Sequence, residues 1–346
     1  MNVAVIGGGL AGSLLAWRLA QYRGIRVTLY AAAAGGATAV SGGLVRCFEP
    51  DPVNAAAAAA GLAELLSSPV LAGWAGFRAT GSVYVCPGVP DPAALAAAAG
   101  PGHLDLCDPA QLRARWGLAG LPDGATGVVE PTAGYLSPAR LAAAVRRDLL
   151  DRGGVLLPVA VRQVRAGAGR PQLLSGDTWI DADVVVVAAG AWTGALLPGT
   201  GLRTKAVQYV VCRARGPLPP AFVDETSGLY GRPDGPGRLL LGLPTDRWDV
   251  PAHTDRFDPA CLPRLRSRVR ERLPGVRLGA VSAQVAAADG YSPDGRLALR
   301  RAPGTDLPLY TFAGGSGGAA KTALAVSAEA AARLLAGTPA PTGGER

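Results

Sequence analysis

A glycine motif near the start of the chain restricts its fold more than any other feature. The apolar stretch Val3–Ile6 runs directly into Gly7-Gly8-Gly9-Leu10-Ala11-Gly12, which has the spacing GxGxxG. Apolar residues then recur at helical spacing as far as Gly24, and Ile25–Tyr30 has the composition of a second strand. A strand, a glycine turn, a helix and a strand in this order predict a βαβ unit that opens an α/β fold.

Each glycine of the motif has a separate task in such a unit. Gly7 permits the tight turn, Gly9 lets the backbone approach a pyrophosphate, and Gly12 lets the helix pack closely on the strand. The first N–H groups of the helix then face the phosphates. A glycine-rich loop without a ligand is the alternative, but three spaced glycines are unfavourable unless bare backbone is needed. The acidic residue that commonly binds the ribose after the second strand is missing, because the sequence there reads Tyr30-Ala31-Ala32.

Two remote segments repeat the pattern of an apolar strand that ends in glycine. Val184–Val187 leads to Ala189-Gly190-Ala191-Trp192, and Leu309–Phe312 leads to Gly314-Gly315-Ser316-Gly317-Gly318. Parallel sheets bind ligands beyond the carboxyl ends of their strands, so three such ends can meet at one long cofactor. We therefore expect an α/β fold with a discontinuous Rossmann-like domain.

The segments between these strands differ in sequence pattern, which predicts a second domain of the α+β class. Residues 206–288 contain apolar strands joined by Pro-Gly turns, which is typical of an antiparallel sheet. The expected parts are a cofactor-binding domain at 1–80, 132–205 and 289–337, a substrate domain at 81–131 and 206–288, and a flexible tail at 338–346.

The net charge of +8 does not by itself indicate a nucleic-acid partner. Nearly all basic residues are arginines, with Lys205 and Lys321 the only lysines, and aromatic residues make up 5% of the chain. The densest basic stretch, Arg264–Arg272, is interleaved with apolar residues at helical spacing, which predicts a solvated helix face. Neither nucleic acid nor a membrane is expected as a partner, since no run of eighteen apolar residues occurs.

Cysteine and histidine usage argues against several kinds of site. The five cysteines are scattered, and His103 and His253 are the two histidines. Their spacing does not suit a disulfide framework, a zinc site or a Ser-His-Asp hydrolase, so no metal is expected. The sequence begins without a basic leader before an apolar segment, and with the cysteine usage this predicts a cytoplasmic protein.

The ordered set of motifs resembles the FAD-dependent D-amino acid oxidase superfamily, in particular its glycine oxidase and sarcosine oxidase branch. Besides the N-terminal motif, the similar segments are Gly42–Arg46, Glu130-Pro131, Ser137–Leu141, Val159–Val161, Ala188–Trp192, Tyr291–Arg296 and Gly314–Lys321. The similarity covers nearly the whole chain. It implies a Rossmann-like FAD-binding domain beside a domain whose antiparallel sheet roofs the substrate cavity.

The resemblance implies oxidation of a C–N bond in an amino acid or an N-substituted glycine-type secondary amine. Hydride would pass to flavin N5, water would hydrolyse the imine, and O2 would reoxidise the flavin with formation of H2O2. The residues that the resemblance places at FAD are Gly7, Gly9, Leu10, Ala11, Gly12, Ser41, Gly42, Gly43, Leu44, Val161, Ala189, Gly190, Trp192, Gly315, Ser316, Gly317, Gly318 and Lys321.

Four side chains are candidates for the chemistry. Lys321 lies one turn after the glycine segment and would stabilise negative charge on the flavin, or else is a solvated lysine. Arg46 would bind a substrate carboxylate, or else form a salt bridge with Glu49. Tyr230 and Arg232 lie two residues apart on an expected strand and so share a face. Arg232 is a second candidate for the carboxylate, or else a turn arginine before a proline.

Three positions depart from the pattern of this branch. No cysteine lies near Ala286–Ala288, where sarcosine oxidases attach FAD, so FAD should be bound without a covalent link. The carboxylate-binding arginine of glycine oxidases is absent from the same stretch, which leaves Asp289. Leu240 stands where sarcosine oxidases carry a lysine that speeds reoxidation by oxygen. The missing anchors favour a tailored, biosynthetic amine over free glycine.

Three other functions stay open at this point. Leu240 indicates a dehydrogenase that passes electrons to an acceptor other than oxygen. The missing ribose acid at Ala31 indicates a non-catalytic flavin-binding subunit. A nicotinamide-dependent dehydrogenase fits least, because the C-terminal glycine segment would have no role in it. The sequence does not indicate an oligomeric state.

Overall fold

The structure is a computed structural model that describes residues 1–32, 35–100 and 102–337. Its helices are α1 (Leu10–Leu19), α2 (Ala37–Val40), α3 (Pro52–Ser67), α4 (Pro69–Ala75), α5 (Pro92–Ala98), α6 (Pro109–Trp116), α7 (Pro138–Asp151), the 3-10 helix η1 (Gly190–Trp192), α8 (Thr193–Leu196), α9 (Cys261–Arg272) and α10 (Ala319–Ala336). The expected tail at 338–346 lies outside the described residues.

Twenty strands form four sheets among the described residues. They are β1 (Asn2–Ile6), β2 (Arg26–Tyr30), β3 (Leu44–Val45), β4 (Arg78–Ala79), β5 (Ser82–Cys86), β6 (Asp105–Cys107), β7 (Thr126–Glu130), β8 (Gly134–Tyr135), β9 (Val155–Leu157), β10 (Val161–Ala166), β11 (Pro171–Ser175), β12 (Thr178–Asp181), β13 (Val184–Val187), β14 (Arg203–Arg215), β15 (Ala221–Asp224), β16 (Tyr230–Pro233), β17 (Arg238–Gly242), β18 (Arg277–Tyr291), β19 (Ala298–Arg301) and β20 (Leu309–Ala313).

A six-stranded sheet gathers strands from remote parts of the chain. Its order is β19-β20-β13-β1-β2-β9, and all neighbours are parallel except the edge pair β19–β20. The carboxyl ends of β1, β13 and β20 therefore lie side by side, as the three strand-to-glycine junctions predicted. The α/β class and the discontinuous Rossmann-like sheet are confirmed.

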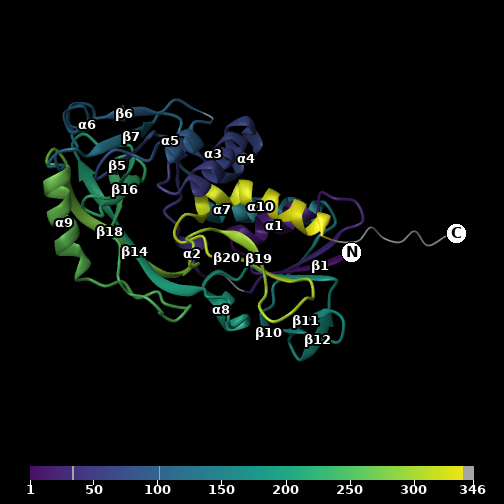
Figure 1. Ribbon diagram of the computed structural model, residues 1–346. Coiled ribbons are helices and arrows are strands. Elements are labelled where there is room, and N and C mark those ends of the chain that lie inside the picture. Colours follow the sequence, from purple (N-terminus) through teal and green to yellow (C-terminus); the bar gives the residue numbers. More distant parts are fainter. Residues whose placement is uncertain (33–34, 101, 338–346) are drawn as a thin grey trace.

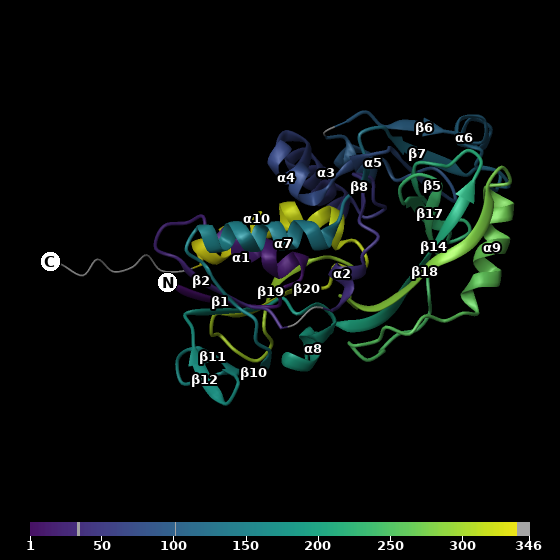
Figure 2. The ribbon, with the colours of Figure 1, turned by 180° about the vertical axis from the view of Figure 1, so that it is seen from behind.

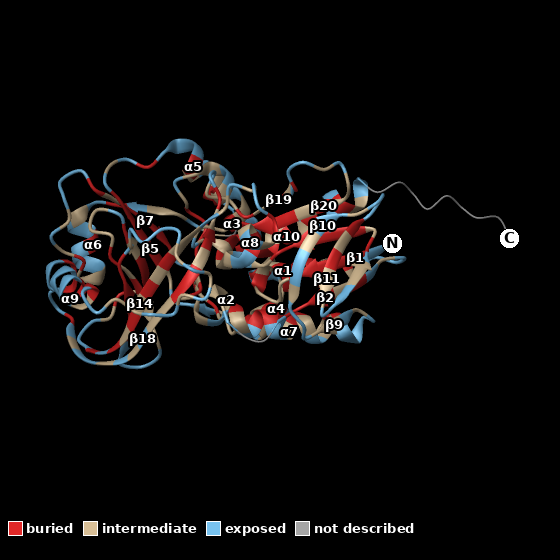
Figure 3. Cartoon of the chain, turned by 90° about the horizontal axis from the view of Figure 1, so that it is seen from below, coloured by how far each residue is buried: buried red, intermediate tan, exposed pale blue. Residues whose placement is uncertain are grey.

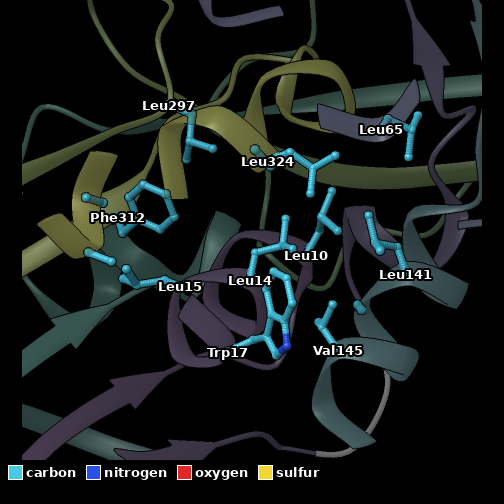
Figure 4. Packing of buried hydrophobic residues seen from close by; sticks show 14 of the residues in the cluster. Leu10, Leu14, Leu15, Trp17, Leu65, Leu141, Val145, Leu297, Phe312 and Leu324 are labelled. Atoms are coloured by element: carbon cyan, nitrogen blue, oxygen red, sulfur yellow. The ribbon is translucent and has the colours of Figure 1, made fainter. Parts of the chain in front are cut away.

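Two layers cover this sheet. On one face, Val3, Val5 and Val186 belong to a buried cluster that includes Leu14 of α1 and Leu141 of α7. Figure 4 shows how side chains of α1, α7 and α10 meet in this cluster. On the other face, the small sheet β10-β11-β12 packs against β1 and β13, so the order of layers is helices, large sheet, small sheet (Figure 1).

An eight-stranded sheet forms the second part of the molecule. Its order is β18-β14-β17-β16-β15-β5-β7-β6. The sheet is antiparallel, as expected, except that β15 pairs with β5 in parallel. Helix α9 covers its outer face, with Leu265 and Val269 in one cluster with Leu239 and Leu241 (Figure 2). In Figure 3 the side of α9 away from the sheet is exposed, while buried residues alternate with less buried ones along β14.

Several details differ from the sequence expectations. The first helix ends at Leu19, and Gly24 instead forms a left-handed turn before β2, with φ of +79°. Residues 81–131 contain α5 and α6 besides three strands, although their sequence shows little periodicity. The arginines of α9 were expected to be solvated, but Arg272 is only 3% exposed. Its Nε donates to Oδ2 of the buried Asp224 at 2.8 Å, which holds the side chain against the protein.

Strands β14 and β18 run across the expected domain boundaries. They contain 13 and 15 residues, and the boundaries at 205/206 and 288/289 fall inside them. Both strands extend from the eight-stranded sheet toward α8, as Figures 1 and 2 show, and Gly290 of β18 packs against Gly190 of η1. No single helix in the described residues is long and apolar enough to cross a membrane, and the pair α3–α4, which passes on length and composition together, is bent by 104°.

Candidate active site

The glycine turn after β1 is shaped by close backbone contacts. Gly7 has φ of +122°, and a Cβ there would lie 2.3 Å from the carbonyl oxygen of Ala188 at the end of β13. A Cβ on Gly12 would lie 2.1 Å from the carbonyl oxygen of Gly7. No other residue type fits at these two positions, because real Cβ atoms do not approach backbone oxygen so closely. The turn therefore brings β1, α1 and β13 together as the motif requires.

The start of α1 remains open for a ligand. Its N-cap, Gly9, has no side chain to cap the helix, and a Cβ there would contact only Thr38, with Oγ1 at 3.1 Å. Leu10 N–H donates to the same hydroxyl at 3.0 Å. The next N–H groups, of Ala11 and Gly12, have no intrahelical acceptor because they belong to the first turn. This arrangement fits a pyrophosphate.

The end of β13 leads into η1, which contacts the second part of the molecule. A Cβ on Gly290 of β18 would lie 3.2 Å from the carbonyl oxygen of Gly190. Gly190 itself faces open space and has φ of +54°. Trp192 is 38% exposed and its ring borders Gly36. Val161 opens β10, is half-buried and packs against the cluster that contains Ile6 and Val187.

The C-terminal glycine segment is tied to β18. Ser316 N–H donates to the carbonyl oxygen of Gly290 at 3.2 Å, and Gly317 N–H donates to Asp289 Oδ2 at 3.0 Å. Ser316 has φ of +48°, which is rare for a residue with a side chain. Three of the N–H groups expected to face the flavin, those of residues 316, 317 and 318, thus have protein acceptors in this structure.

The loop Ser41–Leu44 lies directly beneath the eight-stranded sheet. Arg232 Nε donates to the carbonyl oxygen of Gly42 at 2.6 Å. The two methyl carbons of Leu240 lie 3.7 and 3.8 Å from where a Gly42 Cβ would be. Gly43 has φ of +66°, and its close approach to Leu136 excludes any Cβ. These contacts identify the sheet face that carries Leu240 as the roof over this loop.

The register of the strands shows which other side chains share the roof face. Leu240 pairs with Arg232 and with Val211, and side chains of one face alternate along each strand. The same face therefore carries Tyr230 on β16 and Tyr209 on β14. Tyr209 pairs with Val285 on β18, so the residues two and four positions beyond it, at 287 and 289, also face the loop. The roof face thus includes Tyr209, Tyr230, Arg232, Leu240, Ala287 and Asp289.

Arg46, Glu49 and Lys321 form a buried ion cluster beside this loop. Glu49 Oε1 lies 2.5 Å from Arg46 Nη2 and 3.0 Å from Lys321 Nζ. Burial opposes ionisation of Glu49, but the two cations outweigh it and lower the pKa of its carboxyl. Burial also lowers the pKa of the Lys321 ammonium, against the attraction of Glu49. Arg46 and Lys321 thus share one carboxylate. Arg46 forms the salt bridge with Glu49 that was the alternative to substrate binding, and Lys321 is buried instead of solvated.

Two further residues beside this cluster were given no role from the sequence. Glu130, 2% exposed, accepts hydrogen bonds from the N–H groups of Cys47 and Phe48 at 2.6 and 2.9 Å. It holds the segment that follows Arg46. The Arg46 guanidinium lies 4.6 Å from the ring centre of Tyr84. The sequence signal for Glu130 was its place in a motif, and nothing in the sequence indicated Tyr84.

The remaining two candidates on the roof also have protein partners. Arg232 lies 3.0 Å from Asp234 Oδ1, besides its bond to the Gly42 carbonyl oxygen. Tyr230 donates its hydroxyl to the carbonyl oxygen of Gln208 at 2.9 Å. Burial raises the pKa of Tyr230. The structure therefore brings Arg232 to the glycine loop, while the roles given to both residues stay predictions.

A parallel sheet with glycine turns at its strand ends, covered at one side by a second sheet, defines a dinucleotide-binding protein with a roofed site. The family model described as "FAD dependent oxidoreductase" matches residues 2–334, so the chain belongs to that family. The resemblance stated from the sequence is confirmed. A search of curated proteins by sequence gave no match.

Solved structures of similar fold agree with this assignment. Glycine oxidase from Bacillus cereus ATCC 14579 is 18% identical with a TM-score of 0.76, over 98% of this chain and 96% of that one. L-Proline dehydrogenase from P. horikoshii is 20% identical with a TM-score of 0.80, over 98% and 94%. Iminodiacetate oxidase from Chelativorans sp. BNC1 is 19% identical with a TM-score of 0.71, over 99% and 97%. At these identities the likeness concerns the fold.

The cofactor is therefore FAD, and the residues present fit it. The open start of α1 suits the pyrophosphate, and the loop Ser41–Leu44 with the segment 315–318 lies where the roof meets the parallel sheet. Ala287 faces the site, so the chain offers no thiol there for a covalent link.

Proposed function

We propose that the protein oxidises a C–N bond in a small amine or amino acid, as an FAD-dependent oxidase. The observation that carries this proposal is the roof of the site. Arg232 donates to the Gly42 carbonyl oxygen and Leu240 lies over Gly42, so a sheet face with polar and apolar side chains covers the loop that resembles the flavin loop of amine oxidases. The names of the similar structures, an oxidase of glycine and one of iminodiacetate among them, support the same chemistry.

The chain's own residues would bind the cofactor and the substrate and exclude water. When bound, FAD supplies the two-electron oxidation. The N–H groups of Ala11 and Gly12 would hold its pyrophosphate at the positive end of the α1 dipole. Lys321, at the start of α10, would stabilise negative charge that develops beside it, and Leu240 would keep water away from the reacting carbon. Arg46 and Arg232 remain the proposed anchors for a substrate that carries a carboxylate.

A dehydrogenase, which passes electrons to an acceptor other than oxygen, is the second candidate. The roof carries Leu240 at the position where a cation would speed the reaction of the reduced flavin with oxygen. Leu240 is 1% exposed and lies over the glycine loop. Of the nearby cations, Arg238 lies 3.5 Å from Asp234, and Lys205 lies over the ring of Trp248. One structure of similar fold is named a proline dehydrogenase.

The five cysteines support a reducing compartment as part of this proposal. All of them are buried and free in the described chain.

Anaerobic titration of the purified holoprotein tests the proposed function. The flavin absorption should bleach with one or more members of a panel of primary, secondary and N-methylated amines and amino acids. Admission of air should then separate the two candidates, since an oxidase recovers its colour within seconds and produces H2O2. A holoprotein that no amine bleaches, but that dithionite bleaches normally, would contradict the proposal and favour a non-catalytic flavin subunit.

A further inference from the structure

The cations near the candidate site are already engaged by the protein. Arg46 and Lys321 share Glu49, and Arg232 lies against Asp234. Arg46 and Arg232, the two groups expected to anchor a substrate carboxylate, therefore each have a carboxylate partner within 3.0 Å, and so does Lys321. An external carboxylate would have to displace one of these internal ones.

Asp289 is the opposite case, a carboxylate on the roof face that has no cation. It lies on β18, two residues beyond Ala287 on the same face. Its oxygens accept hydrogen bonds from the N–H groups of Gly290 at 2.8 Å and Gly317 at 3.0 Å. Burial raises the pKa of this carboxyl, and the two N–H groups oppose that effect. Two neutral donors leave lone pairs of an ionised carboxylate free for another partner.

Lys205 would be the natural partner of Asp289 but lies elsewhere. The two residues are direct cross-strand partners on β14 and β18, so their side chains share a face. The Lys205 ammonium instead lies 4.6 Å from the ring centre of Trp248 and 5.6 Å from that of Tyr291. No ion pair joins Lys205 to Asp289 in the part of the chain that the structure describes.

We propose that Asp289 binds a positively charged nitrogen of the substrate other than the neutral amine that is oxidised, so that the preferred substrates are cationic amines that need no carboxylate. This inference rests on the proposed oxidation of an amine and names its substrate class. A carboxylate on the roof attracts a cation and repels an anion in a site of low dielectric constant. The internal pairing of Arg46, Lys321 and Arg232 acts in the same direction, since a substrate anion would have to displace Glu49 or Asp234 from these cations.

Binding of redox-inert probes to the holoprotein tests this proposal without turnover. Tetramethylammonium and propionate have the same number of non-hydrogen atoms and opposite charge, and neither can be oxidised at a C–N bond. Each is titrated at constant ionic strength, and binding is followed by the change in flavin absorption and by calorimetry. Wild type should bind the cation more tightly than propionate.

Asp289→Asn removes the charge but keeps an oxygen for the Gly317 N–H. It should weaken binding of the cation by about tenfold or more, and leave propionate binding equal or tighter. Asp306→Asn is the matched control, because it changes the same charge on an exposed loop. It should alter either affinity by less than about twofold. FAD content and circular dichroism establish that the variants are folded.

Two results would overturn the proposal. One is a wild-type holoprotein that binds propionate more tightly than the cation, and the other is a folded, FAD-loaded Asp289→Asn protein that keeps its affinity for the cation. Should Asp289→Asn not retain FAD, the wild-type comparison still decides. Failure of every amine to bleach the flavin would instead contradict the proposed oxidation and leave this binding result unaffected.

Discussion

Lys321 is a cation in the first turn of α10, where the helix dipole makes a positive charge unfavourable. Glu49 offsets that cost and also neutralises part of the charge on Arg46. One oxygen, Glu49 Oε1, lies within ion-pair distance of both cations. Such a contact is easier to replace by another carboxylate than a bidentate pair would be.

Replacement of Glu49 by glutamine should therefore open the cluster to an external carboxylate. Glu49→Gln leaves two cations with one neutral partner, so propionate should bind about tenfold more tightly than to wild type. The measurement is the propionate titration of the holoprotein described above. Glu64→Gln on α3, which removes the ion pair with Arg18 of α1, is the control and should not change propionate binding.

The same background tests Arg46 as a carboxylate anchor. In Glu49→Gln, the further change Arg46→Ala should remove the gained affinity for propionate, because the planar guanidinium is lost. Arg46→Lys should restore part of it, since an ammonium cannot bind a carboxylate bidentately. Equal propionate affinity in all three proteins would exclude Arg46 as the anchor and leave Arg232 or Lys321.

Glu130 should contribute strongly to stability, because it is the acceptor for two buried N–H groups. Glu130→Ala leaves both without a partner and should lower the free energy of unfolding by roughly 2–5 kcal/mol, whereas Glu130→Gln keeps one acceptor and should cost about half as much. Urea unfolding monitored by circular dichroism measures both. Equal stability of Glu130→Ala and wild type would show that water replaces the carboxylate.

At this scale the sequence predicted glycines better than charges. Gly7 and Gly12 are determined by local geometry, since a tight turn followed by a helix has the same requirement in any fold. Glu49, the partner of Lys321, is 272 positions away in the sequence, and Glu130, the acceptor for the Cys47 N–H, is 83 positions away. No spacing rule reaches across such separations, so only Glu49, three residues from Arg46, was foreseen as a partner.

At the scale of elements, the contact of α3 with α10 depends on Gly61. A Cβ there would lie 2.7 Å from the carbonyl oxygen of Lys321, which is backbone and cannot turn away. Helix propensity alone would favour Gly61→Ala by ~1 kcal/mol. The overlap should cost about 1–3 kcal/mol and separate the start of α10 from α3. Sterics should therefore outweigh propensity.

We expect Gly61→Ala to lower the urea midpoint and weaken FAD binding, because α10 carries Lys321. Gly73→Ala in α4 is the matched control, since nothing lies within 4 Å of its Cβ position. This control should raise stability by up to about 1 kcal/mol. If the two variants shift the midpoint in the same direction, the contact of Gly61 does not limit the packing of α3 on α10.

The roof strand β17 sets the expected response to oxygen. Transfer of an electron to oxygen creates a negative charge that a fixed cation would stabilise, and Leu240 supplies none. Leu240→Lys should therefore speed the oxygen reaction of the prereduced holoprotein in stopped flow and leave anaerobic reduction little changed. Val89→Lys adds the same charge at a position that is 86% exposed and serves as control. A wild-type rate already as fast as that of Leu240→Lys would contradict this reasoning.

Sequence patterns predicted the existence of elements better than their extent. Residues 209–211 and 238–241 were expected to form strands of an antiparallel sheet, and they lie in β14 and β17; that these two strands pair, with Val211 opposite Leu240, is known only from the structure. The lengths of β14 and β18 could not be predicted, because they continue past the sheet into contact with η1 and the glycine segment. Arg272 looked like its solvated neighbours until its partner Asp224 was known.

At the scale of the whole molecule, the site is made where remote segments meet. The site combines four segments that lie far apart in the sequence: the start of α1, the loop Ser41–Leu44, η1 and the segment 315–318. Strands β14 and β18 connect these segments to the eight-stranded sheet. A ligand that contacts all of these segments binds only the folded chain. Its binding free energy therefore adds to global stability.

FAD should accordingly be removable and stabilising. Ala287 faces the site and no thiol lies there, so acid precipitation should leave the yellow colour in the supernatant. Apoprotein prepared under mild conditions should melt at a lower temperature than holoprotein, and added FAD should restore the melting temperature in proportion to the logarithm of its concentration. At a hundredfold excess over the dissociation constant the gain is about 2.7 kcal/mol.

Riboflavin, which lacks the pyrophosphate, is the control and should restore little, because the N–H groups at the start of α1 would have no phosphate to bind. Colour retained in the acid pellet would contradict non-covalent binding, and equal stabilisation by riboflavin would contradict the role given to α1.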